Sequence, residues 1–261
     1  MLKRFLADLR KYNYFCWYSA KTDLKAEVAN SYLNWVWWIL EPLCNMLVYT
    51  FVFGSVFGSN QQYYPVFIYS GLLMWNFFSR TVTYSIKCVR MNRDIVTKVY
   101  VPKFTLLISN MLLNGIKLAI ALCILAAMML VFQVPLTPMI FVAIFVYLIM
   151  FIFAFGCSTI LLHFGVFIDD LGYAIAILIN MMFFMSGVFN DIATTVAAPF
   201  GQILANLNPM AFFISSMRGA LLYGIMPDLR VLLDWAIISI ALCVVGVRTI
   251  YKYENSYVKV V

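Results

Sequence analysis

The stretch NSYLNWVWWILEPL (Asn30–Leu43) opens the first long apolar run of the chain, and it carries the carboxylate of Glu41 directly before Pro42. Long apolar runs recur throughout a chain that is 64% apolar and only 11% charged. A soluble domain of 261 residues needs a far more polar surface. The sequence therefore predicts an all-α integral membrane protein made of one transmembrane domain.

Six apolar runs are long enough to cross a hydrocarbon layer about 30 Å thick at about 1.5 Å of helical rise per residue. We expect these spans at about 35–58, 64–84, 104–132, 139–163, 172–190 and 231–250. Before them, apolar residues at Leu2, Phe5, Leu6 and Leu9 alternate with basic residues. This spacing predicts an amphipathic helix that lies on the membrane surface, within an interface segment 1–33.

The connection 186–230 contains two apolar stretches, VAAPFGQILANL and PMAFFISSMRGALLYG, each too short to cross the membrane. Asn208-Pro209 separates them and is a strong turn signal. The pattern favours a re-entrant helical hairpin that enters from the outer face, between the fifth and sixth spans.

The net charge is +7, and Lys and Arg gather in the first 25 residues, in the connection 85–103 and in the C-terminal tail. This distribution predicts that both termini and the connection 85–103 are cytoplasmic. The basic residues follow membrane topology and form no single soluble face, so we reject nucleic acid as a partner. The six cysteines are dispersed and favour no metal site, and the single His163 is expected to be structural.

Polar side chains recur at helical spacing within the predicted spans. On a straight first span one face collects Asn34, Trp37, Trp38, Glu41, Asn45 and Tyr49; the second adds Asn76, Ser79 and Arg80, and the third Asn110, Asn114 and Lys117. Such residues are costly in lipid unless they face a cavity, a partner helix or each other. One interpretation is a conduit whose amides and aromatic rings suit sugars. The alternative is packing between helices, with the tryptophans forming an interfacial belt.

Within this stripe we expect Glu41 either to reach the membrane interface or to pair with Lys117. Pro42 removes a backbone hydrogen bond and is expected to bend the first span.

The connection KCVRMNRDIVTKVYVPKF (Lys87–Phe104) has an apolar patch of Ile95, Val96 and Val99 beside basic residues. This favours a short amphipathic helix that docks into a groove on a cytosolic partner; the alternative is a loop that binds lipid headgroups. The chain contains no G-x-x-x-x-G-K-[ST] motif and no paired catalytic carboxylates, so we expect it to be no enzyme by itself and to bind no cofactor.

Four patterns together resemble the permease subunit of ABC transporters that export polysaccharides. KTDLKAEVANSYLNWVWWILEPL keeps the family's Asp23, Leu24, Lys25, Ser31, Leu33, Trp37 or Trp38, Pro42 and Leu43, with Asn34 where the family has Gly. GLLMWNFF (Gly71–Phe78) and KVYVPK (Lys98–Lys103) follow, and Asn208, Pro209 and Arg218 match a later motif. The resemblance covers nearly the whole chain.

This resemblance implies a homodimer in a bacterial inner or plasma membrane, with two copies of a cytoplasmic ATPase subunit that binds ATP and Mg²⁺. The cargo would be a lipid-linked glycan such as O-antigen, teichoic acid or capsule. Coupling to the ATPase would involve Arg93, Asp94, Lys98 and Pro102, and the hairpin with Asn208, Pro209 and Arg218 would form part of the outer gate.

Two alternatives stay open from the sequence. An ABC permease of the same architecture could carry a drug, peptide or lipid. An ion-coupled carrier or channel would need a titratable group near the middle of the bilayer, for which Lys117 is the clearest candidate.

Overall fold

The computed structural model describes residues 2–29, 32–56, 61–195, 197 and 200–260. Outside the described residues lie Asn30 and Ser31 of the opening stretch, part of the connection 58–64 between the first two predicted spans, and part of VAAPFGQILANL. All regular secondary structure in the described residues is helical. Its elements are α1 (Leu2–Lys11), α2 (Asn13–Val28), the 3-10 helix η1 (Asn34–Val36), α3 (Trp37–Tyr49), the π-helical segment η2 (Thr50–Val56), α4 (Tyr64–Met91), α5 (Arg93–Lys98), α6 (Lys103–Val131), α7 (Ile140–Phe167), α8 (Leu171–Met185), α9 (Ile192–Thr195), α10 (Phe200–Leu207), α11 (Pro209–Leu222) and α12 (Leu229–Val260).

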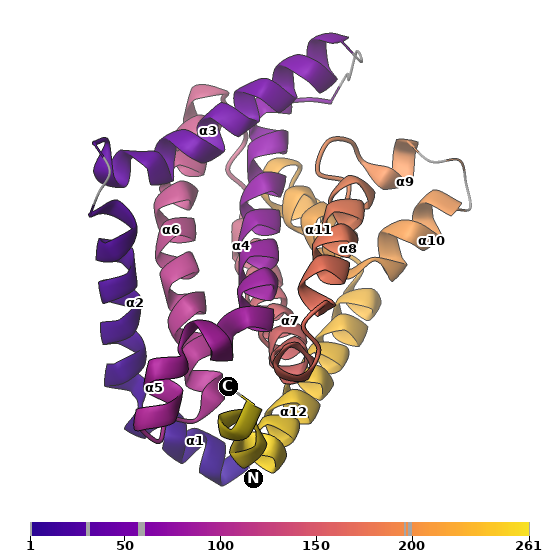
Figure 1. The fold of residues 1–261 in the computed structure, drawn as a ribbon. Coiled ribbons are helices and arrows are strands. Elements are labelled where there is room, and N and C mark those ends of the chain that lie inside the picture. Colours follow the sequence, from indigo (N-terminus) through magenta and orange to yellow (C-terminus); the bar gives the residue numbers. More distant parts are fainter. Residues whose placement is uncertain (1, 30–31, 57–60, 196, 198–199, 261) are drawn as a thin grey trace.

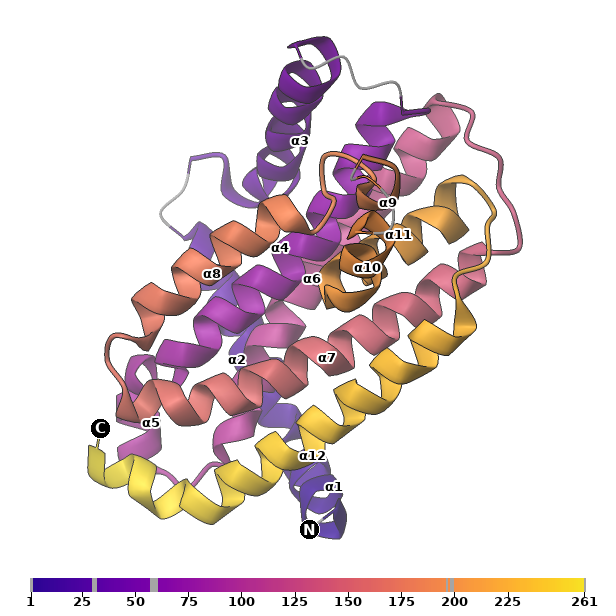
Figure 2. The same ribbon diagram turned by 90° about the vertical axis from the view of Figure 1, so that its right-hand side faces the viewer.

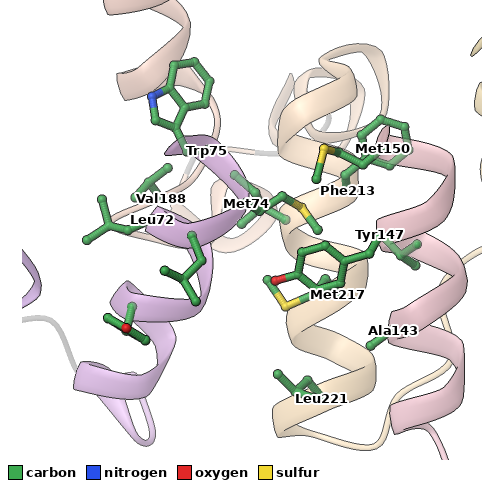
Figure 3. Close-up of a cluster of buried hydrophobic side chains, with 14 of the residues drawn as sticks. Leu72, Met74, Trp75, Ala143, Tyr147, Met150, Val188, Phe213, Met217 and Leu221 are labelled. Atoms are coloured by element: carbon green, nitrogen blue, oxygen red, sulfur yellow. The ribbon is translucent and has the colours of Figure 1, made fainter. Parts of the chain in front are cut away.

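Helix α4 is the centre of the bundle and contacts α3, α6, α7, α8 and α11. Most of its residues are buried, including the whole run from Val66 to Trp75. Met74, Tyr147 and Met217 meet between α4, α7 and α11, each at most 9% exposed (Figure 3). The core therefore lies where the second predicted span packs against the fourth and against the second half of the predicted hairpin.

Helices α7 and α12 lie side by side along most of their length (Figure 2). Two glycines allow this approach. A Cβ added at Gly156 would lie 2.8 Å from Leu242 Cβ, and one at Gly246 would lie 2.0 Å from Thr159 Oγ1. Small residues at a helix crossing let two membrane helices pack closely, as in other membrane bundles.

Among the described residues, four helical segments are long and apolar enough to cross a membrane: Asn34–Ser55, Lys103–Val131, Ile140–Phe167 and Leu229–Tyr257. They coincide with the first, third, fourth and sixth predicted spans. Helix α4 has 28 residues but is less apolar, which fits a helix that touches protein on most sides. Helix α8 has only 15 residues. The count of six spans therefore stays a prediction.

The first span changes its helical type along its length. It begins at Asn34, whose φ is 50°. Glycine adopts this left-handed conformation freely and asparagine tolerates it. Asparagine can therefore stand at the position where the resembled family has glycine. Pro42 lies inside α3, and the last seven residues form the π-helical η2. Figures 1 and 2 show α3 crossing α6 and α4 instead of running along them.

Both termini lie at the same end of the molecule as α1 and α5 (Figure 1). The predicted amphipathic helix is α1. The rest of the predicted interface segment contains a second helix, α2, which packs on α6 through the buried residues Cys16, Ala20 and Leu24. The connection 85–103 is shorter than predicted, because α4 continues to Met91 before α5 begins.

Candidate functional site

A small polar cavity lies where α3 crosses α4 and α6. It has a volume of about 50 Å³. Six polar or aromatic residues of the predicted stripes surround it: Trp38, Glu41, Asn76, Arg80, Asn114 and Lys117. The structure thus brings the polar faces of the first three predicted spans together, as the spacing of these residues indicated.

Glu41 and Arg80 form an ion pair across this cavity. Arg80 Nη2 donates to Glu41 Oε1 at 2.5 Å. Both side chains keep contact with the surroundings, at 51% exposure for Glu41 and 40% for Arg80. The predicted alternative, a pair between Glu41 and Lys117, is wrong because Arg80 of α4 lies nearer to Glu41 where the helices cross.

Lys117 pairs instead with Glu27 of α2, with Lys117 Nζ 2.5 Å from Glu27 Oε2. The Lys117 side chain is 13% exposed, and its ammonium lies 5.9 Å from the centre of the Trp38 ring. Carboxylate and indole together lower the cost of placing this cation inside an apolar bundle. Two acid–base pairs therefore stand side by side, each joining two different helices.

The two asparagines of α6 bond to each other. Asn114 Nδ2 donates to Asn110 Oδ1 at 2.9 Å, and Asn114 is buried. Asn110 is half-buried, so its remaining amide groups can meet water or a ligand.

Four residues of the face predicted for the first span do not line the cavity: Asn34, Trp37, Asn45 and Tyr49. Trp37 is 47% exposed, and Asn45 is also exposed. The ring of Tyr49 packs 5.0 Å from Phe189 and 6.1 Å from Phe183. Beyond Pro42, α3 stays packed against the core through Met46 and Tyr49, but its side chains no longer line the cavity.

At the end of the molecule that carries both termini, α5 presents charges to its surroundings. Arg93, Asp94 and Lys98 are exposed, whereas Pro102 is buried directly before α6. The predicted apolar patch is divided, because Val96 is 4% exposed and packs into the core while Val99 is 57% exposed. The surface that α5 offers is therefore mainly charged, and the predicted patch contributes less of it than expected, because Val96 is buried.

A polar cluster beside α5 joins α1, α12 and the connection 99–102. Arg4 Nη2 donates to Glu254 Oε1 at 3.0 Å and to Tyr100 Oη at 2.9 Å, and Tyr251 Oη donates to Asp8 Oδ2 at 2.6 Å. The hydrogen bond to Glu254 raises the pKa of Arg4. Burial and then the Glu254 charge raise the pKa of Tyr100, which keeps its hydroxyl protonated as a donor. The sequence analysis missed this cluster, since its members are far apart in the chain.

The connection between α7 and α8 reaches the same end. Arg90 of α4 pairs with Asp169 and donates from Nη2 to the Val166 carbonyl at 3.0 Å. One carboxylate of this connection, Asp169, is thus paired with a residue of α4. His163 nearby lies 2.9 Å from Tyr257 Oη through Nδ1, a structural contact as predicted.

The opposite end of the molecule is organised by Asn208 and Arg218. Asn208 caps α11, because its Oδ1 accepts from the amides of Met210 at 3.1 Å and Ala211 at 3.4 Å. Its Nδ2 donates to the Met185 carbonyl at 2.9 Å, and Pro209 occupies the first helical turn. One side chain therefore begins α11 and fixes the end of α8.

Arg218 is 3% exposed and holds the same connection. Its Nη1 donates to the Gly187 carbonyl at 2.6 Å, its Nη2 donates to the Val188 carbonyl at 2.8 Å, and its guanidinium lies 3.5 Å from the centre of the Phe67 ring. Beside it is a polar pocket of about 340 Å³, whose lining includes Asn190 and Asp228.

The ABC-2 type transporter family matches residues 17–222, from α2 to the end of α11. The chain belongs to this family. Over 240 residues it is 27% identical to the O-antigen export system permease protein RfbA of Myxococcus xanthus, covering 92% of each chain. It is 25% identical over 203 residues to a protein of the same name from Klebsiella pneumoniae, covering 77% of this chain and 78% of that protein. It is also 25% identical over 214 residues to the inner membrane transport permease YadH of Escherichia coli K12, covering 77% and 82%.

In this ABC-2 transporter chain, both the polar cavity and the Arg218 contacts fall inside the matched region. Sequence reasoning missed one member of the site, Glu27, because α2 was taken as part of a surface segment. A signal was present: Cys16, Ala20 and Leu24 repeat at every fourth position and mark a helix face that packs on protein. Among the described residues, no group of three or more His, Cys, Asp and Glu side chains could hold a metal ion.

Proposed function

We propose that this ABC-2 chain is the membrane subunit of an exporter that moves a lipid-linked polysaccharide outward across a bacterial inner membrane. The whole chain acts as one permease domain, with six spans, both termini in the cytoplasm and the helical hairpin entering from the outer face. Two copies of the chain form the path, and two cytoplasmic subunits supply the energy by hydrolysing ATP with Mg²⁺.

One observation carries the proposal beyond family membership: three helices turn charged and amide side chains toward a shared cavity inside an apolar bundle. Placing such groups inside an apolar bundle is costly, and a protein that only had to be anchored in the membrane would not need them. The relatives named as O-antigen export permeases support a glycan as cargo. Sugar hydroxyls both donate and accept hydrogen bonds, and amides, carboxylates and cations satisfy them.

The path would use the residues around the cavity together with those exposed beside it. Trp38, Glu41, Asn114 and Lys117 lie at the cavity. The further members proposed for the path are Trp37, Asn45, Tyr49 and Asn110. When a second copy of the chain is present, exposed Trp37 would offer an aromatic face to a sugar ring, and Asn45 would offer an amide.

Energy would enter through α5. Its exposed Arg93, Asp94 and Lys98 suit a charged groove on the ATPase, and Pro102 fixes the start of α6 so that a push on α5 is passed on. At the far end, Asn208, Pro209 and Arg218 would hold α11 as part of the outer gate. The chain itself would bind no cofactor.

The test is a deletion in the organism that carries the chain. We expect loss of the surface polysaccharide together with accumulation of the lipid-linked glycan inside the cell, and restoration by the wild-type chain. Unchanged surface glycan in the deletion strain would contradict the proposed cargo. Purified chain without a second subunit should show no ATPase activity above background; activity from the chain alone would contradict the two-component arrangement.

A second candidate function keeps the ABC architecture and changes the cargo to a drug, peptide or other lipid. The relative named inner membrane transport permease YadH supports this second candidate, because that name specifies no glycan. Co-purification from native membranes separates the two: a lipid-linked glycan bound to the complex supports the first, and its absence with another bound solute supports the second.

A further inference from the structure

A large apolar groove lies on the side of the bundle formed by α6, α7 and α12. It has a volume of about 630 Å³, and apolar side chains form almost all of its lining. Phe77 of α4 and Phe155 of α7 contribute to it, as do Phe5 and Leu9 of α1. Helix α1 lies at the end of the molecule that carries the termini (Figure 1). The lining of the groove shares Phe77 with the polar cavity and no residue with the pocket beside Arg218.

The three helices beside this groove are among the segments long and apolar enough to cross a membrane. A hollow between such helices opens to hydrocarbon, and an apolar lining offers water no hydrogen-bond partners. The chemistry that matches it is a hydrocarbon chain. Its volume falls within the range of about 300–1,000 Å³ typical of pockets that bury a whole small ligand.

Gly115 opens the wall of the groove on α6. A Cβ placed on Gly115 meets no atom within 4 Å, in contrast to Gly156 and Gly246, where a Cβ would collide with the neighbouring helix. The other two glycines are thus needed for helix packing, whereas Gly115 leaves open space beside the groove. A larger side chain at Gly115 would fill the groove without disturbing a helix contact.

Helix α1 gives the groove a charged end. Its Phe5 and Leu9 line the groove, while Lys3, Arg10 and Lys11 of the same helix are exposed. Basic residues at a membrane surface attract anionic headgroups by about 1 kcal/mol each. An apolar groove that ends at a basic surface helix fits a phospholipid with an acyl chain and an anionic headgroup.

We propose that this groove binds an acyl chain of an anionic membrane phospholipid, whose phosphate lies against the basic side of α1. The bound lipid fastens α1 to α6, α7 and α12. The inference does not depend on the identity of the exported cargo.

The experiment compares the full chain with Gly115→Phe after purification in a mild detergent, using native mass spectrometry. The matched control is Ala127→Phe, since Ala127 is exposed on the same helix outside the groove lining. We expect wild type and control to retain phosphatidylglycerol, and Gly115→Phe to retain about tenfold less, the change expected when about two methylene groups lose their contacts. Ala119→Phe, also in the groove, replaces Gly115→Phe if that variant fails to fold.

A second arm tests the headgroup in lipid nanodiscs that contain phosphatidylglycerol and phosphatidylcholine. The double variant Arg10→Gln with Lys11→Gln should lose the preference for phosphatidylglycerol while still binding a lipid. Equal lipid retention by Gly115→Phe and wild type would overturn the proposal. So would finding the lipid carrier of a glycan, or a second copy of the chain, in place of phospholipid.

Discussion

The polar cavity around Glu41 and the contact around Arg218 both place charge inside an apolar bundle, but they hold it in different ways. At the cavity, side chains of one helix pair with side chains of another, and both partners of the Glu41–Arg80 pair are 40% exposed or more. At Arg218 a guanidinium that is 3% exposed donates to two backbone carbonyls of one connection.

This difference assigns separate tasks to the two regions. Along the proposed transport path, where water would reach the exposed pair, the two charges can separate at small cost, because each is resolvated when it leaves its partner. A buried cation that donates to backbone carbonyls cannot leave without depriving these carbonyls of their hydrogen-bond donors. The cavity is therefore suited to change during transport, and the Arg218 contact is suited to stay fixed. The predictions below test this contrast through the free energy of unfolding and through export.

The largest effect is expected from Arg218→Met. The change leaves the carbonyls of Gly187 and Val188 buried without their donors, so we expect a loss of about 3 kcal/mol in the free energy of unfolding. Denaturant unfolding in detergent measures it. The matched control is Arg230→Met at an exposed position, expected to change stability by less than about 0.5 kcal/mol. Equal stability of the two variants would show that Arg218 is not the fixed contact described above.

The next effect is expected from Lys117→Met. Methionine keeps the apolar stem beside Trp38 but removes the ammonium from Glu27, and we expect a loss of about 1.5 kcal/mol because Lys117 is only 13% exposed. Lys25→Met on the exposed side of α2 is the control. Export should fall but stay driven by ATP. Complete loss of export, together with loss of any dependence on a proton gradient, would instead favour an ion-coupled carrier.

A smaller effect is expected at Asn208, whose amide has two functions. Asn208→Ala removes the helix cap and should cost about 1 kcal/mol from that loss alone. Asn208→Ser keeps a cap acceptor but cannot reach the Met185 carbonyl, so the difference between the two variants isolates the cap. If alanine and serine lowered stability equally in thermal unfolding, the cap would contribute nothing to the start of α11.

Much of this molecule follows from the spacing of apolar residues. The amphipathic α1 and a helix in each of the six predicted spans are present, because apolar composition leaves little choice but a helix in a membrane, although α8 has only 15 residues. The start of α11 was also readable, since Asn208-Pro209 is both a turn signal and a cap. Conversely, α2 was missed because its apolar face is narrow, consisting of Cys16, Ala20 and Leu24.

The candidate site was predictable in part. Helical spacing placed Trp38 and Glu41 on one face of the first span and Asn114 and Lys117 on one face of the third, and these four residues line one cavity. It could not choose their partners, because a pairing depends on where two helices cross and spacing describes one helix at a time. For this reason the spacing did not predict that Glu41 pairs with Arg80. The cluster of Arg4, Tyr100 and Glu254 needs the whole fold, since no local pattern joins residues from the two ends of the chain.

The smallest change in stability, and the sharpest test of the comparison, is expected at Glu41 and Arg80. Neutralising either residue, as Glu41→Gln or Arg80→Gln, should change the free energy of unfolding by less than about 0.5 kcal/mol, because both side chains are exposed enough to be resolvated. Export should nevertheless fall severalfold if the pair must form and separate in the transport cycle. The exchanged pair, Glu41→Arg with Arg80→Glu, keeps one charge of each sign at the crossing and should restore export above either single variant. If single and exchanged variants export like wild type, the pair has no part in transport. If they unfold as easily as Arg218→Met, the cavity is a fixed contact too and the contrast between the two regions fails.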